Sequence, residues 1–219
     1  MRSKTQNNAC NLSLIKYLTE YFYTGSELLN RSNVSESEFT QLQMRSIMPK
    51  ASYKLDMSLT CHSYFGCHDS QQLVYFYPKA YTGWLKKCVS YDTQQEALTE
   101  FSRLFYEAKN RLSENVFWLD DNKIMTAFDG FIAQQWPHFL AGTYGVCTKR
   151  GLPFDILSKE LAVTTIRALL DKTSLSVTEK AHLSRAVRCL KKVGSQFAPH
   201  ERALSQQHQL LAQLESLSR

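Results

Sequence analysis

The spacing of hydrophobic residues changes twice along the chain, which divides it into a helical, a β and a second helical part. Between residues 12 and 23, apolar side chains recur at three- and four-residue steps, which predicts a short amphipathic helix. Between Tyr53 and Leu59, apolar and polar residues alternate, as is typical of a half-buried strand. The aromatic run Leu73–Pro78 predicts a second strand. We therefore expect a small β-hairpin whose turn lies within residues 66–72.

From Tyr81 onward the pattern is helical almost throughout. Apolar residues at helical spacing predict helices over residues 93–112, 123–135, 154–170 and 177–193, and a last one that opens at Pro199. We expect Pro137 to interrupt the second helix of this series. Gly194 is expected to end the helix over residues 177–193 in a left-handed conformation. These helices predict a C-terminal helical bundle over residues 86–219.

The segment between the first helix and the hairpin has the outline of a helix-turn-helix. Thr24 with Glu27, and Ser35 with Glu38, have the spacing of capping boxes, so each pair marks the start of a short helix. Such a pair of helices most often places its second helix in a DNA groove. The predicted fold is thus mainly α, with an N-terminal helix-turn-helix and a small, wing-like β-hairpin over residues 12–85, followed by the helical bundle.

This segment resembles the N-terminal module of the MerR-type regulators and of related excisionase-like domains. The matching residues are Tyr23-Thr24, Leu28, Val34-Ser35, Phe39, Leu42, and Ile47-Met48-Pro49 through Tyr53. The resemblance implies that residues 24–54 dock on DNA or on a protein partner.

The residues of this segment also suggest which side chains would make such a contact. Gln41 and Gln43 are suited to adenine edges, and Arg45, Lys50 and Lys54 to phosphates or acidic groups. Glu36 and Glu38 stand where the regulators carry arginine, and their charge opposes a phosphate backbone. A protein-docking role is therefore the alternative.

A second resemblance covers about Leu14 to Leu170. The segments that carry it are the helix-turn-helix, YFYPKAYTGW (Tyr75–Trp84) and WPHFLAGTYGVCTKRGLPFDI (Trp136–Ile156). The chain looks like a bacterial family of uncharacterised proteins that bear the label natural-product biosynthesis protein. This resemblance implies a mostly helical cytoplasmic protein and brings no established reaction with it.

Trp136–Ile156 is also the best candidate for an active site. His138, Tyr144 and Cys147 are residue types that serve as acids, bases or nucleophiles, and Asp129 is a possible orienting carboxylate. The segment matches no phosphate-binding loop or dinucleotide fingerprint. Its glycines also suit a tight corner between helices. An accessory enzyme of a small-molecule pathway is thus the alternative to a regulatory or adaptor protein.

Cys61-His62 and Cys67-His68 lie close together across the expected hairpin. Thiolate and imidazole groups are zinc ligands. Neighbouring residues of a strand point to opposite faces, however, so the four side chains do not converge easily. We therefore expect no metal and no cofactor, and leave open whether these four residues bind a metal.

Composition adds the last constraints. The net charge is +6, and from Ser176 to Arg219 seven lysines and arginines stand against three glutamates. This basic face is suited to nucleic acid or an acidic partner, or is simply a solvated surface. The sequence has neither an apolar run of about 18 residues nor a signal peptide, so we expect a cytoplasmic protein without membrane contact. The leucine stripe of the last helix, Leu204, Leu210, Leu211 and Leu214, is suited equally to the seam of a homodimer and to packing inward.

Overall fold

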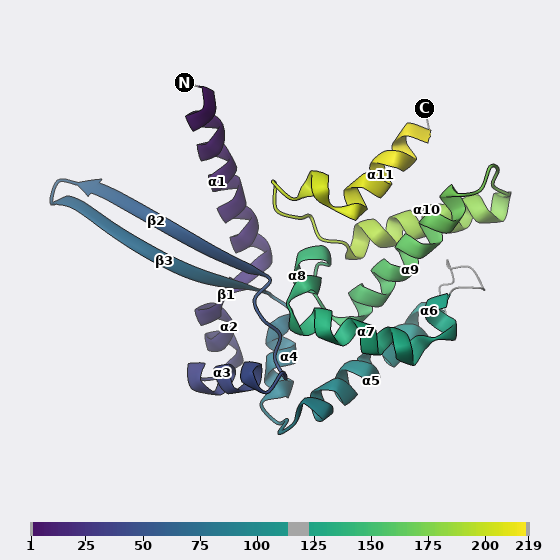
Figure 1. The fold of residues 1–219 in the computed structure, drawn as a ribbon, viewed down its shortest axis with the longest axis horizontal. Coiled ribbons are helices and arrows are strands. Elements are labelled where there is room, and N and C mark those ends of the chain that lie inside the picture. The colour runs from purple at the N-terminus through teal and green to yellow at the C-terminus, as the bar shows by residue number, and fades with distance from the viewer. Residues whose placement is uncertain (1, 114–122, 218–219) are drawn as a thin grey trace.

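The computed structural model describes residues 2–113 and 123–217 and shows a mainly α chain from which one long β-hairpin projects (Figure 1). The first half contains α1 (Arg2–Tyr21), β1 (Phe22–Thr24), α2 (Gly25–Ser32), α3 (Glu36–Met44), β2 (Tyr53–Ser63), β3 (Gly66–Pro78) and α4 (Tyr81–Cys88). The second half contains α5 (Gln94–Ser113), α6 (Lys123–Thr126), α7 (Phe128–Leu140), α8 (Thr143–Cys147), α9 (Pro153–Leu170), α10 (Val177–Val193), the 3-10 helix η1 (Arg202–Leu204) and α11 (Gln206–Leu217). No helix among the described residues is both long and apolar enough to span a membrane.

The predicted mainly α content is confirmed, but the predicted architecture is wrong. The chain does not open on a helix-turn-helix with a small hairpin followed by a bundle. It opens on the 20-residue helix α1, and the segment before α2 is the strand β1. β1 pairs antiparallel with the end of β3, where Phe22 lies opposite Pro78, so the sheet has the order β1-β3-β2. The helix expected over residues 12–23 therefore starts earlier and stops at Tyr21, because the aromatic residues after it pair as a strand.

The hairpin is much longer than predicted. β2 has 11 residues and β3 has 13, and they pair without a break from Tyr53 opposite Phe76 to Ser63 opposite Gly66. The expected turn at residues 66–72 is strand. The chain instead reverses at residues 64–65, and Gly66 adopts a positive φ of 120°. The alternation of apolar and polar residues stops beyond Leu59 because both faces of the outer hairpin are exposed.

The predicted helix starts are largely confirmed. Thr24 and Glu27 form a reciprocal capping box at the start of α2. The Ser35 side chain accepts the N–H of Glu38 at the start of α3. Asn33 ends α2 in the left-handed conformation with a φ of 56°. These two short helices therefore form where their caps predict.

The helices of the second half show three departures from prediction. α7 continues through Pro137 to Leu140. Gly194 does end α10, but in an extended conformation (φ −69°, ψ 147°), because it forms an isolated antiparallel bridge with Thr148. The last helix begins at Gln206, after η1, and not at Pro199.

A single large core links both halves of the chain. It extends from Leu28 in α2 to Leu210 in α11. At its centre the Trp84 ring of α4 packs against Phe101 of α5 and Phe139 of α7, with centroid distances of 6.4 and 5.1 Å. These aromatic contacts join α4, α5 and α7 by burial of large apolar surfaces.

A second, smaller core anchors α1 and the root of the sheet. Tyr17 and Leu18 of α1 and Phe76 of β3 are buried together with Ala198, which follows α10. The Tyr17 hydroxyl lies 3.1 Å from Ser195 Oγ, 178 residues further along the chain. The first helix is therefore held by the segment between the last two long helices.

Candidate functional site

The outer part of the β2–β3 hairpin is the most unusual surface of the molecule. From Ser58 to Asp69 every residue is exposed, whereas Phe76, Tyr77 and Pro78 at the root are buried. An 11-residue strand such as β2 spans roughly 35 Å. Figure 1 shows this arm extending away from all helices of the body. Because a two-stranded ribbon is at best marginally stable in water, its outer part contributes little to the fold.

Two adjacent aromatic residues occupy the tip of this arm. Tyr64 is 97% and Phe65 is 95% exposed, and their rings meet edge to face with centroids 5.4 Å apart. The Phe65 N–H donates to Ser63 Oγ at 3.2 Å, which fixes the turn. Sequence reasoning missed these residues because it placed the turn further along. The available signal was the unusual pair of aromatic residues immediately before Gly66, where turn residues are normally polar.

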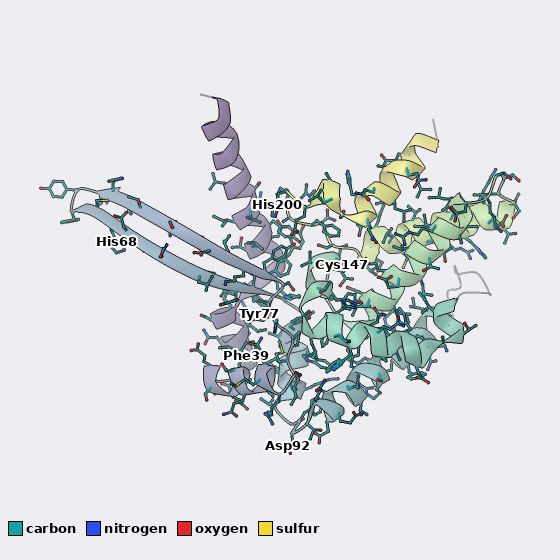
Figure 2. The ribbon with its side chains drawn as sticks, in the orientation of Figure 1. Phe39, His68, Tyr77, Asp92, Cys147 and His200 are labelled. Carbon is teal, nitrogen blue, oxygen red and sulfur yellow. The ribbon has the colours of Figure 1, made fainter. Side chains whose placement is uncertain are left out.

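The strand register separates the four cysteine and histidine residues into two pairs. Cys61 lies opposite His68 on one face, and His62 lies opposite Cys67 on the other. All four are exposed, and both thiols are free. Figure 2 shows His68 on the outer part of the arm. No group of three or more His, Cys, Asp or Glu residues suited to a metal occurs in the part of the chain that the structure describes.

The predicted docking residues come from three different elements. Gln41 is exposed on α3, and Lys54 is exposed on β2 opposite Tyr75. Arg45 caps α3, and its Nη1 donates to the carbonyl of Asp92 at 3.2 Å. Lys50 is exposed in the linker that follows, where its N–H donates to Leu140 O at 2.8 Å. These residues therefore do not line one helix face.

The exposed side of α3 is not suited to a phosphate backbone. Its nine residues include Glu36 and Glu38 but neither lysine nor arginine. Gln43, expected to read base edges, donates instead to Pro49 O at 2.9 Å beside Tyr77. The potential of this face is thus negative or neutral, whereas affinity for nucleic acid comes largely from cations.

The proposed catalytic residues have structural partners. The buried Tyr144 hydroxyl donates to Gln135, a partner that the sequence did not reveal. His138 is exposed, with its ring centroid 6.4 Å from that of Tyr144. Asp129, considered as an orienting carboxylate, accepts a hydrogen bond from Tyr106 instead. The three candidate residues and Asp129 therefore do not form a linked acid-base chain.

Cys147 lies in the helical body (Figure 2), where burial raises the pKa of its thiol. A nucleophilic cysteine needs the opposite shift. The charges that act on this thiol are those of Lys159 and Glu160. The Lys159 Nζ and Glu160 Oε1 atoms are themselves 2.9 Å apart. Because burial keeps the thiol protonated, the structure favours a packing role for Cys147.

The segment that contains Gly142 and Gly145 packs against the residues at the root of the hairpin. A Cβ on Gly142, which has a φ of +80°, would lie 2.7 Å from the carbonyl oxygens of Lys50 and Ala51. A Cβ on Gly145 would lie 2.0 Å from Ser52 Oγ, and this hydroxyl donates to Gly142 O at 2.9 Å. The corner between α7 and α9 thus packs directly on the linker that leads into β2.

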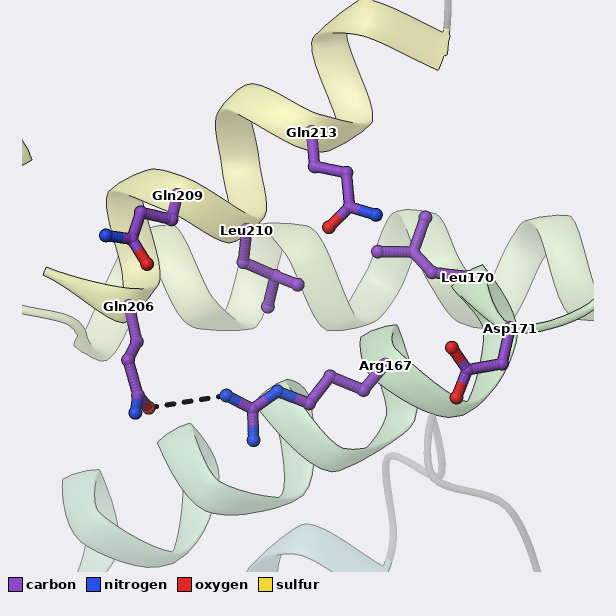
Figure 3. A pocket seen from close by; sticks show the side chains of 7 residues that line it. All are labelled: Arg167, Leu170, Asp171, Gln206, Gln209, Leu210 and Gln213. Carbon is purple, nitrogen blue, oxygen red and sulfur yellow. Dashed lines mark hydrogen bonds between the residues drawn. The ribbon is translucent and has the colours of Figure 1, made fainter.

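A small pocket with a mainly polar lining lies between α9 and α11 (Figure 3). Its volume is about 200 Å³, and Leu170 and Leu210 lie between the polar side chains around it. Arg167 Nη2 donates to Gln206 Oε1 across it at 3.4 Å. The remaining polar lining residues are Asp171, Gln209 and Gln213. This pocket is suited to a small hydrogen-bonding molecule.

The comparisons with known proteins relate to the helical half alone. A model of a family described as a family of unknown function (DUF6058) matches residues 97–217. These residues run from α5 to α11, so the hairpin lies outside the match. No curated protein and no solved structure matches the chain.

Proposed function

Since the chain belongs to the family of unknown function DUF6058, its membership brings no activity with it, and we propose that the protein is an adaptor or regulatory protein. On this proposal its β2–β3 hairpin is an arm that docks a protein partner. The observation that carries the proposal is the pair Tyr64 and Phe65, both almost fully exposed at the end of an arm that contributes little to the fold.

The energetics of association support this role. Aromatic residues at the centre of an interface are the commonest residues that dominate binding energy. Leu59, Leu73 and Tyr75 are also exposed along the arm, the first on one face and the other two on the opposite face. An arm with apolar side chains on both faces and at its tip is suited to insertion into a groove of a partner.

The charge of the arm favours a protein over DNA. Between Tyr53 and Pro78 the charged residues are Lys54, Asp56 and Asp69, which give a formal charge of −1 when histidine is neutral. Arms that enter DNA grooves depend on arginine and lysine. The face of α3 also lacks cations. We therefore place the docking surface on the hairpin and its partner among proteins.

The test uses site-specific crosslinking in living cells of the source organism. A photoreactive phenylalanine analogue replaces Tyr64, and the control carries it at Tyr106, an exposed tyrosine of α5. We expect a discrete crosslinked protein at position 64 that is missing at position 106. The identified partner is then purified, and the Tyr64→Ala/Phe65→Ala variant should bind it at least about 30-fold more weakly, equivalent to roughly 2 kcal/mol.

Two results would contradict the proposal. One is an identical crosslinking pattern at both positions, and the other is unchanged affinity in the double variant.

A capture of fragmented genomic DNA at two salt concentrations completes the test, with Gln41→Ala/Arg45→Ala as control. Enrichment of discrete DNA sites that the control loses would favour a DNA-binding regulator instead.

A further inference from the structure

We infer that Cys61 and His68 form half of a zinc site and that a second copy of this chain supplies the other half. The two residues lie directly opposite each other on neighbouring strands. Both are exposed, and the Cys61 thiol is free. The zinc ion would then join the hairpins of two chains. This inference goes beyond the proposed function, because it concerns the protein alone and does not depend on a partner.

The geometry of a cross-strand pair suits two ligands of one tetrahedral ion. The Cβ atoms of directly opposed residues in an antiparallel pair lie about 4.5–5.5 Å apart. Zinc binds sulfur at about 2.3 Å and nitrogen at about 2.0–2.1 Å, so two such ligands are separated by roughly 3.5 Å around the ion. Both side chains are long enough to reach that spacing from one face of a ribbon.

One chain cannot complete the coordination sphere within its described residues. Structural zinc sites have four protein ligands, and no three potential ligands gather in the described part of this chain. A two-fold axis through the ion would bring a second Cys61 and a second His68 to it. The resulting set of two thiolates and two imidazoles neutralises the charge of the ion.

Apolar side chains are exposed on both faces of the hairpin, but its carboxylates, Asp56 and Asp69, lie only on the face that carries Cys67, so the face that carries Cys61 is better suited to this contact. Leu59 lies two residues before Cys61 on the same face and is 47% exposed, and Met57 follows toward the root. A second copy would bury these apolar side chains. On the opposite face, Asp69 lies beside Cys67 and accepts a hydrogen bond from Thr60 Oγ1 at 2.6 Å. A two-fold contact there would bring two carboxylates together in a desolvated interface.

The experiment measures metal-dependent mass with the purified full chain under a phosphine reductant that keeps thiols reduced. Zinc is titrated while light scattering after size exclusion gives the mass, and cobalt replaces zinc for absorption spectroscopy. We expect the mass to double at one zinc per two chains and to return to the monomer value with a chelator. Cobalt should give the intense visible bands of a tetrahedral site with thiolate ligands.

The opposite face provides matched variants. Cys61→Ser and His68→Ala should each abolish the zinc-dependent dimer and the cobalt bands, whereas Cys67→Ser and His62→Ala should leave both unchanged. All four positions are exposed, so none of these substitutions threatens the fold.

Several results would overturn the inference. They are a monomer at every zinc concentration, a dimer that requires Cys67 and His62 instead, and a dimer that survives the chelator but dissociates under stronger reduction. The last result would identify an intermolecular disulfide. A protein that dimerises with zinc but lacks the crosslinked partner would contradict the proposed function alone, so the two failures are distinguishable.

Discussion

At the scale of single residues, glycine determines how the hairpin is attached to the body. Gly142 combines a positive φ with contact to two backbone carbonyl groups, and Gly151, with a φ of +67°, would place a Cβ 2.8 Å from the Tyr81 ring. A side chain at either position meets both an unfavourable backbone conformation and a filled space. The sequence predicts a tight corner here, but not its contacts, because Lys50 and Ala51 lie about 90 residues earlier in the chain.

We expect Gly142→Ala to lower the free energy of unfolding by roughly 2–4 kcal/mol, the combined cost of a left-handed alanine and of overpacking. Urea unfolding followed by circular dichroism measures the change. The matched control is Gly130→Ala inside α7, where an added Cβ meets nothing within 4 Å. Alanine should stabilise that helix by roughly 0.5–1 kcal/mol. Equal stability of the two variants would show that the corner is not tightly packed.

The candidate site was predictable at this scale only in part. The cysteine and histidine residues stood out by their spacing, and the strand rule indicated that they do not all converge. The pairing of Cys61 with His68 and of His62 with Cys67 depends on a turn at residues 64–65, whereas the sequence pattern predicted the turn at residues 66–72. Tyr64 and Phe65 were missed for the same reason. A shift of the turn changes every cross-strand partner, so side chains at a hairpin end are difficult to pair from sequence.

At the scale of elements, a charged cluster ties α4 to α5. Glu100 of α5 lies 2.5 Å from Lys87 Nζ of α4 and 2.6 Å from Arg103 Nε. Hydrogen bonds from Arg103 and Lys87, with Arg103 the stronger cause, lower the pKa of Glu100 to about 2, although burial acts in the opposite direction. The Glu100 side chain is 12% exposed, so solvent screens this pair less than an ordinary surface pair.

Glu100→Gln should therefore destabilise the protein by about 1–2 kcal/mol at pH 7. A carboxyl whose folded pKa is depressed stabilises the fold above its ordinary value of about 4.5, and this contribution is lost as the pH falls toward 2. The difference in unfolding free energy between wild type and variant should thus shrink between pH 5 and pH 2.

Glu107→Gln serves as the control for the charged cluster, because Glu107 also pairs with Arg103 but is 54% exposed. Its effect should stay within about 0.5 kcal/mol. A pH-independent loss in Glu100→Gln would mean that the side chain acts through packing and not through its charge.

The hairpin should be separable from the stability of the body. Replacement of residues 58–71 by Asn-Gly leaves Met57 and Gln72, which are paired in β2 and β3, beside a favourable two-residue turn. The removed residues are almost all exposed. We expect the melting temperature, measured by calorimetry, to stay within roughly 2 °C of wild type. The variant should no longer bind the partner protein identified by crosslinking. A large drop in melting temperature would assign the outer arm a structural role.

Helices and strands were predictable from the sequence where they bury one face and expose the other. α9 and α10 form over the predicted residues because each combines an apolar face with a start signal, Pro153 in one and the Ser176–Glu179 box in the other. The outer hairpin lacks a buried face, so its residues carry no periodic signal. The helix α7 passes through Pro137, where surrounding aromatic packing outweighs the local cost of proline.

At the scale of the whole molecule, the aromatic core predicts one cooperative unfolding transition. Trp84 of α4 is 2% exposed, and its Nε1 donates to Ile47 O at 3.2 Å. Trp84→Ala should lower the unfolding free energy by about 3–5 kcal/mol. Far-ultraviolet circular dichroism and intrinsic fluorescence should give coincident transitions in wild type and shift together in the variant. Two separated transitions would instead indicate that the halves on either side of residue 85 unfold independently.

The long-range arrangement was the least predictable property. The pairing of Phe22 with Pro78 in the sheet and the packing of Tyr17 on Ser195 join segments far apart in the sequence. Periodicity and caps report only on neighbours within a few turns, so they predict helices and not the contacts that order them. The mistaken order of elements at the N-terminal end came from this limit.

The contact between α1 and Ser195 has a consequence for biosynthesis. A ribosome adds about 5–20 residues per second, so the 178 residues that separate Tyr17 from Ser195 take roughly 10–35 s to appear. During that interval Tyr17, Leu18 and Phe22 lack Ala198, which completes their core. The apolar residues at the end of α1 thus lack part of their core until most of the polypeptide has been translated. Chaperones that bind exposed apolar side chains should therefore be able to contact the end of α1 until Ala198 has been added.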